Sequence, residues 1–298
     1  MTFKNSVRIL SSNFSLCWKQ LVWIVCASLV VIGFAFLVAM PVFDMLTENG
    51  FFVATKDCFE SIYAAPKNAV SNFVNLIDML VSLISSGASK LWPNYLGVCL
   101  VVLVLGSIVR CLGLFATSGV LGERMASNAQ IAYTNRMFSK LGRAISYSVA
   151  YICISIPFYA VVLGLVVAYV KIAKTAILAI VLLPVFSVLL YLVFSMKVTL
   201  FACMLPEMID GTRNPFKAFA NGIKVQRKRF WRTFSNAICV VLSVVFANLF
   251  LGIFTLGAGL LVTIPASSVF LAAFGLVSHY AATGKSFYVS DLVVVNLK

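Results

Sequence analysis

The chain of 298 residues contains few charged side chains. Charged residues make up 11% of it, against about 25% in an ordinary soluble domain. Hydrophobic residues make up 62%, whereas about 45–50% is usual. This balance excludes a soluble globular protein and predicts a chain whose length is spent on bilayer spans of about 20 residues each.

The residues that carry common catalytic and metal chemistry are scarce. There is one histidine, and the eight cysteines include no Cys-x-x-Cys pair, so neither a zinc pattern nor a disulfide framework is present. The sequence also contains no P-loop, no Gly-x-Ser-x-Gly and no His-Glu-x-x-His string. We therefore expect no cofactor, no metal and no intrinsic enzymatic activity, and we interpret the cysteines as packing residues.

Six segments are long and apolar enough to cross a bilayer, which predicts an all-α, polytopic membrane protein forming a single domain over residues 1–298. Lys4, Arg8 and Lys19 before the first segment are similar to the basic region of a signal peptide. However, the apolar run is too long and no small-residue cleavage site follows, so we expect a retained span. The predicted spans are Leu21–Met40, Leu96–Thr117, Ile145–Val170, Thr175–Met196, Phe234–Leu256 and Leu260–Ala282.

The distribution of lysine and arginine predicts the orientation, because positive residues near span ends stay on the cytoplasmic side. With the N-terminus inside, the outer connections hold only Lys56, Lys67, Lys90, Lys171 and Lys174. The inner set is much larger, so both termini are expected in the cytoplasm of a bacterial-type plasma membrane. That set is Lys4, Arg8, Lys19, Arg124, Arg136, Lys140, Arg143, Arg213, Lys217, Lys224, Arg227, Lys228, Arg229, Arg232, Lys285 and Lys298. We interpret the net charge of +14 as a topology signal and expect no nucleic-acid partner.

The outer segment 41–94 is the one long connection on its side. Apolar residues recur there at helical spacing between residues 70 and 84, which predicts an amphipathic helix with Pro66 in its first turn and Gly87 at its end. A helix lying flat on the outer leaflet, or capping the bundle, is the main interpretation. A lid over a substrate site is the alternative.

The inner loop 206–233 has the clearest local pattern. Asp210-Gly211 predicts a turn, and Asn214-Pro215 predicts an N-cap followed by proline at the first helical position. In the helix that follows, Phe216, Phe219, Ala220, Ile223 and Phe230 are expected on one face and Lys217, Asn221, Lys224 and Lys228 on another. This pattern predicts an interfacial helix that contacts anionic lipid of the inner leaflet. The candidate headgroup contacts are Lys217, Lys224, Arg227, Lys228, Arg229 and Arg232.

Residues 200–245 resemble a known membrane domain. The pair Pro206-Glu207 follows the end of a predicted span. After it come a turn at a glycine, a helix that begins at a proline, and a basic, aromatic stretch that leads into the next span. This order is similar to that of the multi-span membrane domain attached to some bacterial glycerophosphodiester phosphodiesterases, and of related bacterial membrane proteins. The resemblance implies a membrane domain without catalytic residues, since the phosphodiesterase barrel has no counterpart here.

Three polar residues in or near the spans are candidates for an in-membrane site: Arg110, Asn248 and His279. We expect Arg110 to reach the inner headgroups, with contact to a buried anion as the alternative. Asn248 is expected to join neighbouring helices, and His279 to pack at the interface. Glu207 is expected to be a solvated or Arg-paired loop residue.

Two functions remain open. The first is a non-enzymatic accessory or scaffold component that contacts lipid, a partner membrane protein or a cytoplasmic subunit. The second is a permease-like subunit for a small or amphiphilic solute, favoured by Arg110, Asn248 and the prolines Pro157, Pro184 and Pro265 inside the spans. A polar cavity reaching Arg110 or Asn248 favours the second.

Overall fold

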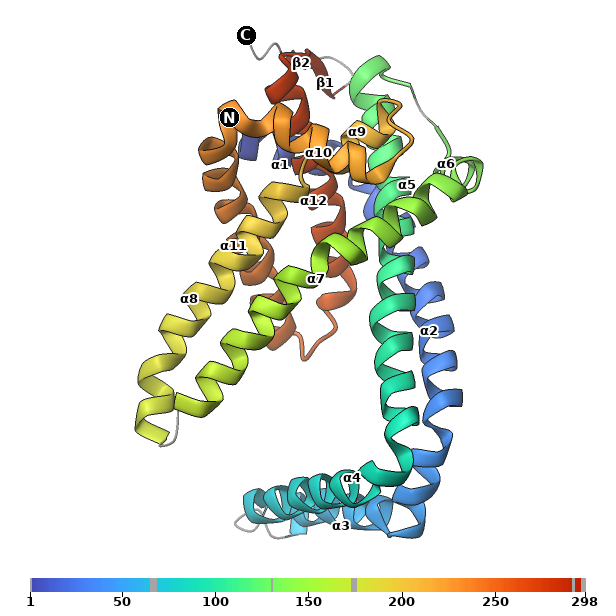
Figure 1. Cartoon of the computed structure of the whole chain (residues 1–298), viewed down its shortest axis with the longest axis vertical. Coiled ribbons are helices and arrows are strands. Elements are labelled where there is room, and N and C mark those ends of the chain that lie inside the picture. Colours follow the sequence, from blue (N-terminus) through green and yellow to red (C-terminus); the bar gives the residue numbers. More distant parts are fainter. Residues whose placement is uncertain (1, 65–68, 130, 173–175, 291–292, 296–298) are drawn as a thin grey trace. The chain divides into compact units, whose positions relative to one another are not determined.

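The computed structural model describes residues 2–64, 69–129, 131–172, 176–290 and 293–295. Most of these residues are helical (Figure 1). The α-helices are α1 Thr2–Ser12, α2 Ser15–Glu48, α3 Phe51–Ala64, α4 Ala69–Leu100, α5 Gly106–Ser127, α6 Tyr133–Ser139, α7 Leu141–Ile172, α8 Ala176–Phe201, α9 Met204–Ile209, α10 Pro215–Gln226, α11 Phe230–Phe254 and α12 Leu260–Thr283. The shorter elements are the π-helix η2 Val101–Leu105, the 3-10 turn η3 Arg227–Arg229, and the strands β1 Phe287–Ser290 and β2 Val293–Val295.

Six helical segments of the described chain are long and apolar enough to span a membrane, which confirms the multi-pass prediction. Five of them are largely exposed along their apolar stretches, with 17% or less of each stretch buried. Helices that are apolar all round and yet exposed have their apolar surface in lipid rather than in water. The six segments are Ser15–Glu48, Ser89–Ser127, Leu141–Tyr169, Val181–Ile209, Pro215–Phe254 and Leu260–Thr283.

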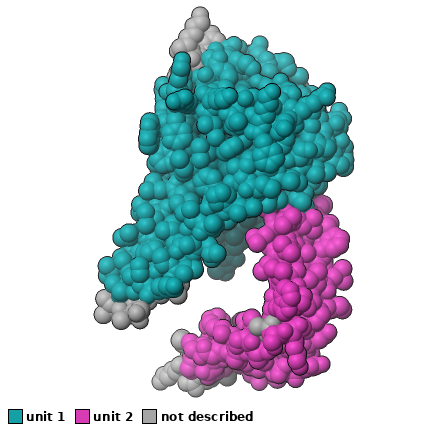
Figure 2. Space-filling view, in the orientation of Figure 1, with its two compact units in different colours: residues 1–25, 108–298 teal, residues 26–107 magenta. Residues whose placement is uncertain are grey.

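The chain divides into two compact units, residues 1–25 with 108–298 and residues 26–107 (Figure 2). The first unit is organised around α12, of whose span 56% is buried. Helices α1, α9, α10 and α11 all contact α12. Gly275 lets the chain between α8 and α9 approach closely, since a Cβ at this position would lie 2.7 Å from the carbonyl oxygen of Ala202.

The loop between α9 and α10 folds as its sequence predicts. Gly211 adopts a φ of 126°, and the Asn214 side chain accepts hydrogen bonds from the backbone N–H groups of Phe216 and Lys217. The expected division of faces on α10 is wrong, because Phe216 is exposed whereas Phe219 packs inward at 5.3 Å from the Phe201 ring. The buried face is formed by the small residues Ala218 and Gly222, followed by Gln226, which lets α10 approach α9.

The second unit contains two packed helices where one was expected. Helices α3 and α4 contact each other and run across the direction of the end of α2 (Figure 1). Helix α3 was not predicted, and the expected helix end at Gly87 is wrong because α4 continues to Leu100. Gly87 instead permits close packing on α2, since a Cβ there would lie 2.6 Å from the Met45 sulfur. The prediction for Pro66 lies outside the described residues.

The C-terminal segment adds a short hairpin, which was not predicted, to an otherwise helical chain. β1 and β2 pair antiparallel, with Phe287 opposite Val295 and Tyr288 opposite Val294. Phe287 is buried and lies 5.6 Å from the ring of Tyr280 on α12. The hairpin therefore packs onto the same end of the first unit as α1, α9 and α10 (Figure 1).

Candidate functional site

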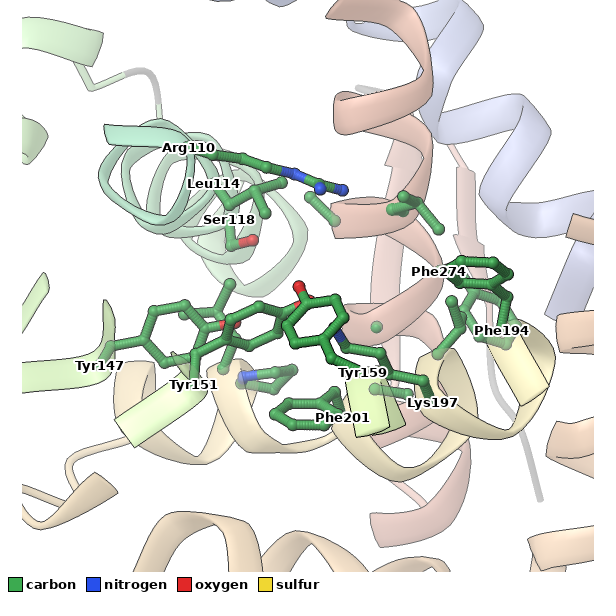
Figure 3. A pocket seen from close by; sticks show the side chains of 17 residues that line it. Arg110, Leu114, Ser118, Tyr147, Tyr151, Tyr159, Phe194, Lys197, Phe201 and Phe274 are labelled. Carbon is green, nitrogen blue, oxygen red and sulfur yellow. The ribbon is translucent and has the colours of Figure 1, made fainter. Parts of the chain in front are cut away.

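The first unit contains a pocket of about 260 Å³ between α5, α7, α8, α9 and α12. Arg110 and Ser118 come from α5, and Lys197 comes from α8. Aromatic residues form much of the wall, with Tyr151, Tyr159 and Phe201 near Lys197 and Tyr147 beyond Tyr151 (Figure 3). Ala272 and Gly275 of α12 complete the lining with small residues.

Lys197 lies inside a cage of aromatic rings. Its Nζ is 4.1 Å from the ring centre of Tyr159, 4.9 Å from that of Tyr151 and 5.9 Å from that of Phe201. The residue is only 8% exposed. The negative faces of aromatic rings attract an ammonium group, which partly replaces the water that Lys197 has lost. Within the described chain, Lys197 forms no ion pair.

The opposite wall of the pocket carries a second cation and an unpaired hydroxyl. The Arg110 side chain is exposed and lines the pocket from α5 (Figure 3). About two helical turns further along α5, the Ser118 Oγ is buried and finds no hydrogen-bond partner among the described residues. The expected contact of Arg110 with inner headgroups remains a prediction. The alternative, contact with a buried anion, is compatible with the pocket that Arg110 lines.

Asn248 joins two helices. Its side-chain N–H₂ donates to the Ser267 hydroxyl at 3.0 Å, and its oxygen accepts from the Thr263 hydroxyl at 2.7 Å. These contacts hold α11 against α12, as the sequence favours, and Asn248 does not line the pocket of Arg110.

His279 and Glu207 form a pair that the sequence interpretation missed. His279 Nε2 lies 3.0 Å from Glu207 Oε1, and its Nδ1 lies 4.0 Å from Asp210 Oδ2. Asp210 also accepts a hydrogen bond from Lys285 Nζ at 2.8 Å. His279 is thus a buried partner of carboxylates in and just after α9, and Glu207 pairs with this histidine where an arginine or solvent was expected. The interfacial position expected for His279 stays a prediction. The spacing of 72 residues hid this contact.

A second buried polar group missing from the sequence analysis is Gln20 on α2. Its Oε1 accepts hydrogen bonds from Thr117 at 3.0 Å and from Tyr133 at 2.8 Å. Burial raises the pKa of Tyr133 to about 12, which keeps its hydroxyl protonated as the donor of this bond. This network joins α2, α5 and α6 and is structural in character.

The basic residues of the inner loop lie on an exposed surface, here called the basic elbow, which comprises residues 215–232. Lys217, Lys224, Arg227, Lys228 and Arg232 are exposed, and Arg229 is half-buried. Within the described chain, none of them pairs with a carboxylate. Trp231, 77% exposed, lies between Arg229 and Arg232 and packs against Phe230.

No cluster of three histidine, cysteine or acidic side chains suited to a metal occurs among the described residues. Of the cysteines, Cys17, Cys58, Cys111 and Cys203 are buried and the other four are exposed. Comparison with protein-family models, with curated proteins and with solved structures finds no match for this chain. The features of the described chain that bear on function are therefore the pocket and the basic elbow.

Proposed function

We propose that this chain is a non-enzymatic component of a bacterial-type plasma membrane that holds the anionic inner leaflet through its basic elbow and serves as an accessory or scaffold protein. The observation that carries the proposal is the exposure of Trp231 among basic side chains that have no acidic partner among the described residues. A tryptophan next to unpaired lysine and arginine is the composition of a membrane interface facing anionic headgroups. A partner membrane protein or cytoplasmic subunit would bind at the same end.

The orientation belongs to this proposal and is supported by the position of the basic residues. Lys4 and Arg8 on α1 lie at the same end of the first unit as α10 and Lys285, whereas Lys171 ends α7 at the other end (Figure 1). The order of elements that resembles the membrane domain of bacterial glycerophosphodiester phosphodiesterases is consistent with an accessory role. We assign α3 and α4 to the outer interface, since Phe73, Ile77 and Val81 of α4 form an exposed apolar stripe.

Reporter fusions should establish the topology. A reporter active only outside the cytoplasm should be active when joined after Gly50 or Ser86 and silent when joined after Gly211 or Lys298. The positive-inside bias predicts this pattern, because the most basic connections should remain on the cytoplasmic side. An active fusion at Gly211 would contradict the orientation and, with it, the assignment of the basic elbow to the inner leaflet.

Charge reversal in the basic elbow should impair membrane insertion. Replacing Lys224, Arg227, Lys228 and Arg229 by glutamate removes attraction of about 1 kcal/mol per residue for an anionic leaflet and adds repulsion. We expect a lower yield in the membrane fraction, or a reversed orientation of α11 and α12, measured by fractionation and by the reporter joined after Lys298. The matched control is Lys56→Glu with Lys90→Glu on the outer side, which should insert normally. Normal insertion of the elbow variant would indicate that these charges serve a protein partner.

A permease-like subunit for a small or amphiphilic solute is the second candidate function. One observation favours it, namely the pocket that Arg110 lines within a candidate span. Transport requires a site of this kind at membrane depth. Because Asn248 lies outside the pocket and bonds to α12, the candidate site reduces to Arg110 and the residues around Lys197.

A further inference from the structure

We infer that the Arg110–Lys197 pocket binds the phosphate headgroup of an anionic amphiphile, with Lys197 and Arg110 as its two cationic contacts. This inference goes beyond the proposed function, because the pocket shares no residue with the basic elbow. It concerns one defined site rather than attraction to a charged leaflet. The shared chemistry is a phosphate group, which either a lipid or free inorganic phosphate could supply.

The state of Lys197 is the first argument. A buried ammonium group normally pairs with a carboxylate or shifts toward its neutral form, because removing the charge from water is costly. Lys197 is 8% exposed, forms no ion pair within the described chain, and has three aromatic ring centres within 6 Å of its Nζ. The rings supply part of the missing stabilisation, and an anion in the pocket would supply the rest.

The composition of the pocket is the second argument. No carboxylate occurs among the described residues that line it, so two cations line one small cavity without an internal counter-ion. Ser118, which comes from the same helix as Arg110, is 1% exposed, and its Oγ has no hydrogen-bond partner among the described residues. A phosphate group has several acceptor oxygens, which suits a planar guanidinium, an ammonium and a hydroxyl together.

The size and surroundings of the pocket favour a headgroup attached to an apolar chain. A volume of about 260 Å³ lies just below the roughly 300–1,000 Å³ of pockets that enclose whole drug-sized ligands. Tyr159 and Phe194, both of which line the pocket, are nearly half exposed, so the pocket opens to the surface of α7 and α8. That surface is apolar, with Ile156, Leu163 and Val188 exposed. A headgroup would fill the cavity while its acyl chain lies along these helices.

Native mass spectrometry of the full chain in a neutral detergent can test this site. Phosphatidylglycerol, zwitterionic phosphatidylcholine and inorganic phosphate are titrated separately against the wild-type protein and three variants. We expect one saturable phosphatidylglycerol site, weakened about tenfold or more by Lys197→Met and by Arg110→Gln. Lys171→Met, which makes the same change at an exposed lysine outside the pocket, should leave this affinity unchanged. Arg110 is exposed, so its variant remains informative even where Lys197→Met reduces folding.

The ligands distinguish the two sources of phosphate. Strong binding of phosphatidylglycerol that free phosphate does not displace supports a lipid ligand. Saturable binding of inorganic phosphate with the same dependence on Lys197 and Arg110 supports the site with a soluble ligand. Binding that is equal in all variants, or equal for phosphatidylglycerol and phosphatidylcholine, overturns the inference. The pocket variants leave the elbow charges in place, and no residue of the basic elbow lines the pocket, so failure of one proposal does not imply failure of the other.

Discussion

Replacing Gly275 by alanine should lower the free energy of unfolding by about 2–3 kcal/mol, or prevent folding. The new Cβ would lie 2.7 Å from the Ala202 carbonyl oxygen, which is too close for a non-bonded contact. The atom it meets belongs to the backbone between α8 and α9, where Cys203 and Met204 are fully buried. A flexible side chain could rotate away, but this segment can move only if α9 shifts from α12. Unfolding in mixed detergent and denaturing micelles measures the effect.

Two other glycines provide a graded comparison. At Gly222, an added Cβ would meet the backbone and Cβ of Cys203 at 3.1–3.2 Å, so Gly222→Ala should destabilise the protein less than Gly275→Ala. Gly164 lies in α7 with nothing within 4 Å, and Gly164→Ala should stabilise the protein by up to about 1 kcal/mol through helix propensity. Equal stability of the three variants would contradict the close packing of α12 against the start of α9.

The positions of the spans could be read from the sequence because they depend on local composition. The sixth span was predicted as Leu260–Ala282, and α12 runs from Leu260 to Thr283. The cap at Asn214-Pro215 was equally accessible, since its hydrogen bonds join residues two and three positions apart. In both cases the interactions that stabilise the element depend on residues close together in the sequence, so the local pattern is sufficient to predict it.

The missed features depend on contacts between distant residues or on weak patterns. Lys197 follows the predicted end of the fourth span at Met196, and nothing in its neighbourhood shows that Tyr151 and Tyr159 of α7 surround it. Helix α3 mixes Lys56, Asp57 and Glu60 with apolar residues and has no run long enough to stand out. The C-terminal strands have only three or four residues each, too few to establish a period-two alternation.

The candidate site was likewise predicted where the signal is local and missed where it depends on contacts between distant residues. Arg110 was identified because a charge inside an apolar run is unusual, and it does line a pocket. Its neighbours in that pocket come from five helices, so the sequence could not group them. His279 was identified as a lone histidine, but its partner Glu207 lies 72 residues away, on a short helix that only the folded chain brings to α12.

Removing either member of the Glu207–His279 pair should destabilise the protein by about 3–5 kcal/mol. His279 Nε2 and Glu207 Oε1 are joined by a hydrogen bond of 3.0 Å. The His279 side chain is 2% exposed and that of Glu207 is 15% exposed, so water cannot readily replace the lost partner. His279→Ala would leave the Glu207 carboxyl group without its hydrogen-bond partner. Glu207→Ala would leave the buried imidazole of His279 without its partner.

A double-mutant cycle separates this pair from general damage. The double variant should be less destabilised than the sum of the single variants, with a coupling of at least about 1 kcal/mol, because the penalty for an unpaired buried group disappears when both are removed. The exposed pair Lys56–Glu60, 3.7 Å apart with side chains 74% and 65% exposed, is the matched control. Its coupling should be below about 0.5 kcal/mol, as for other exposed helix pairs. Additive effects of Glu207→Ala and His279→Ala would show that the two residues act independently and that the attachment of α9 to α12 has another cause.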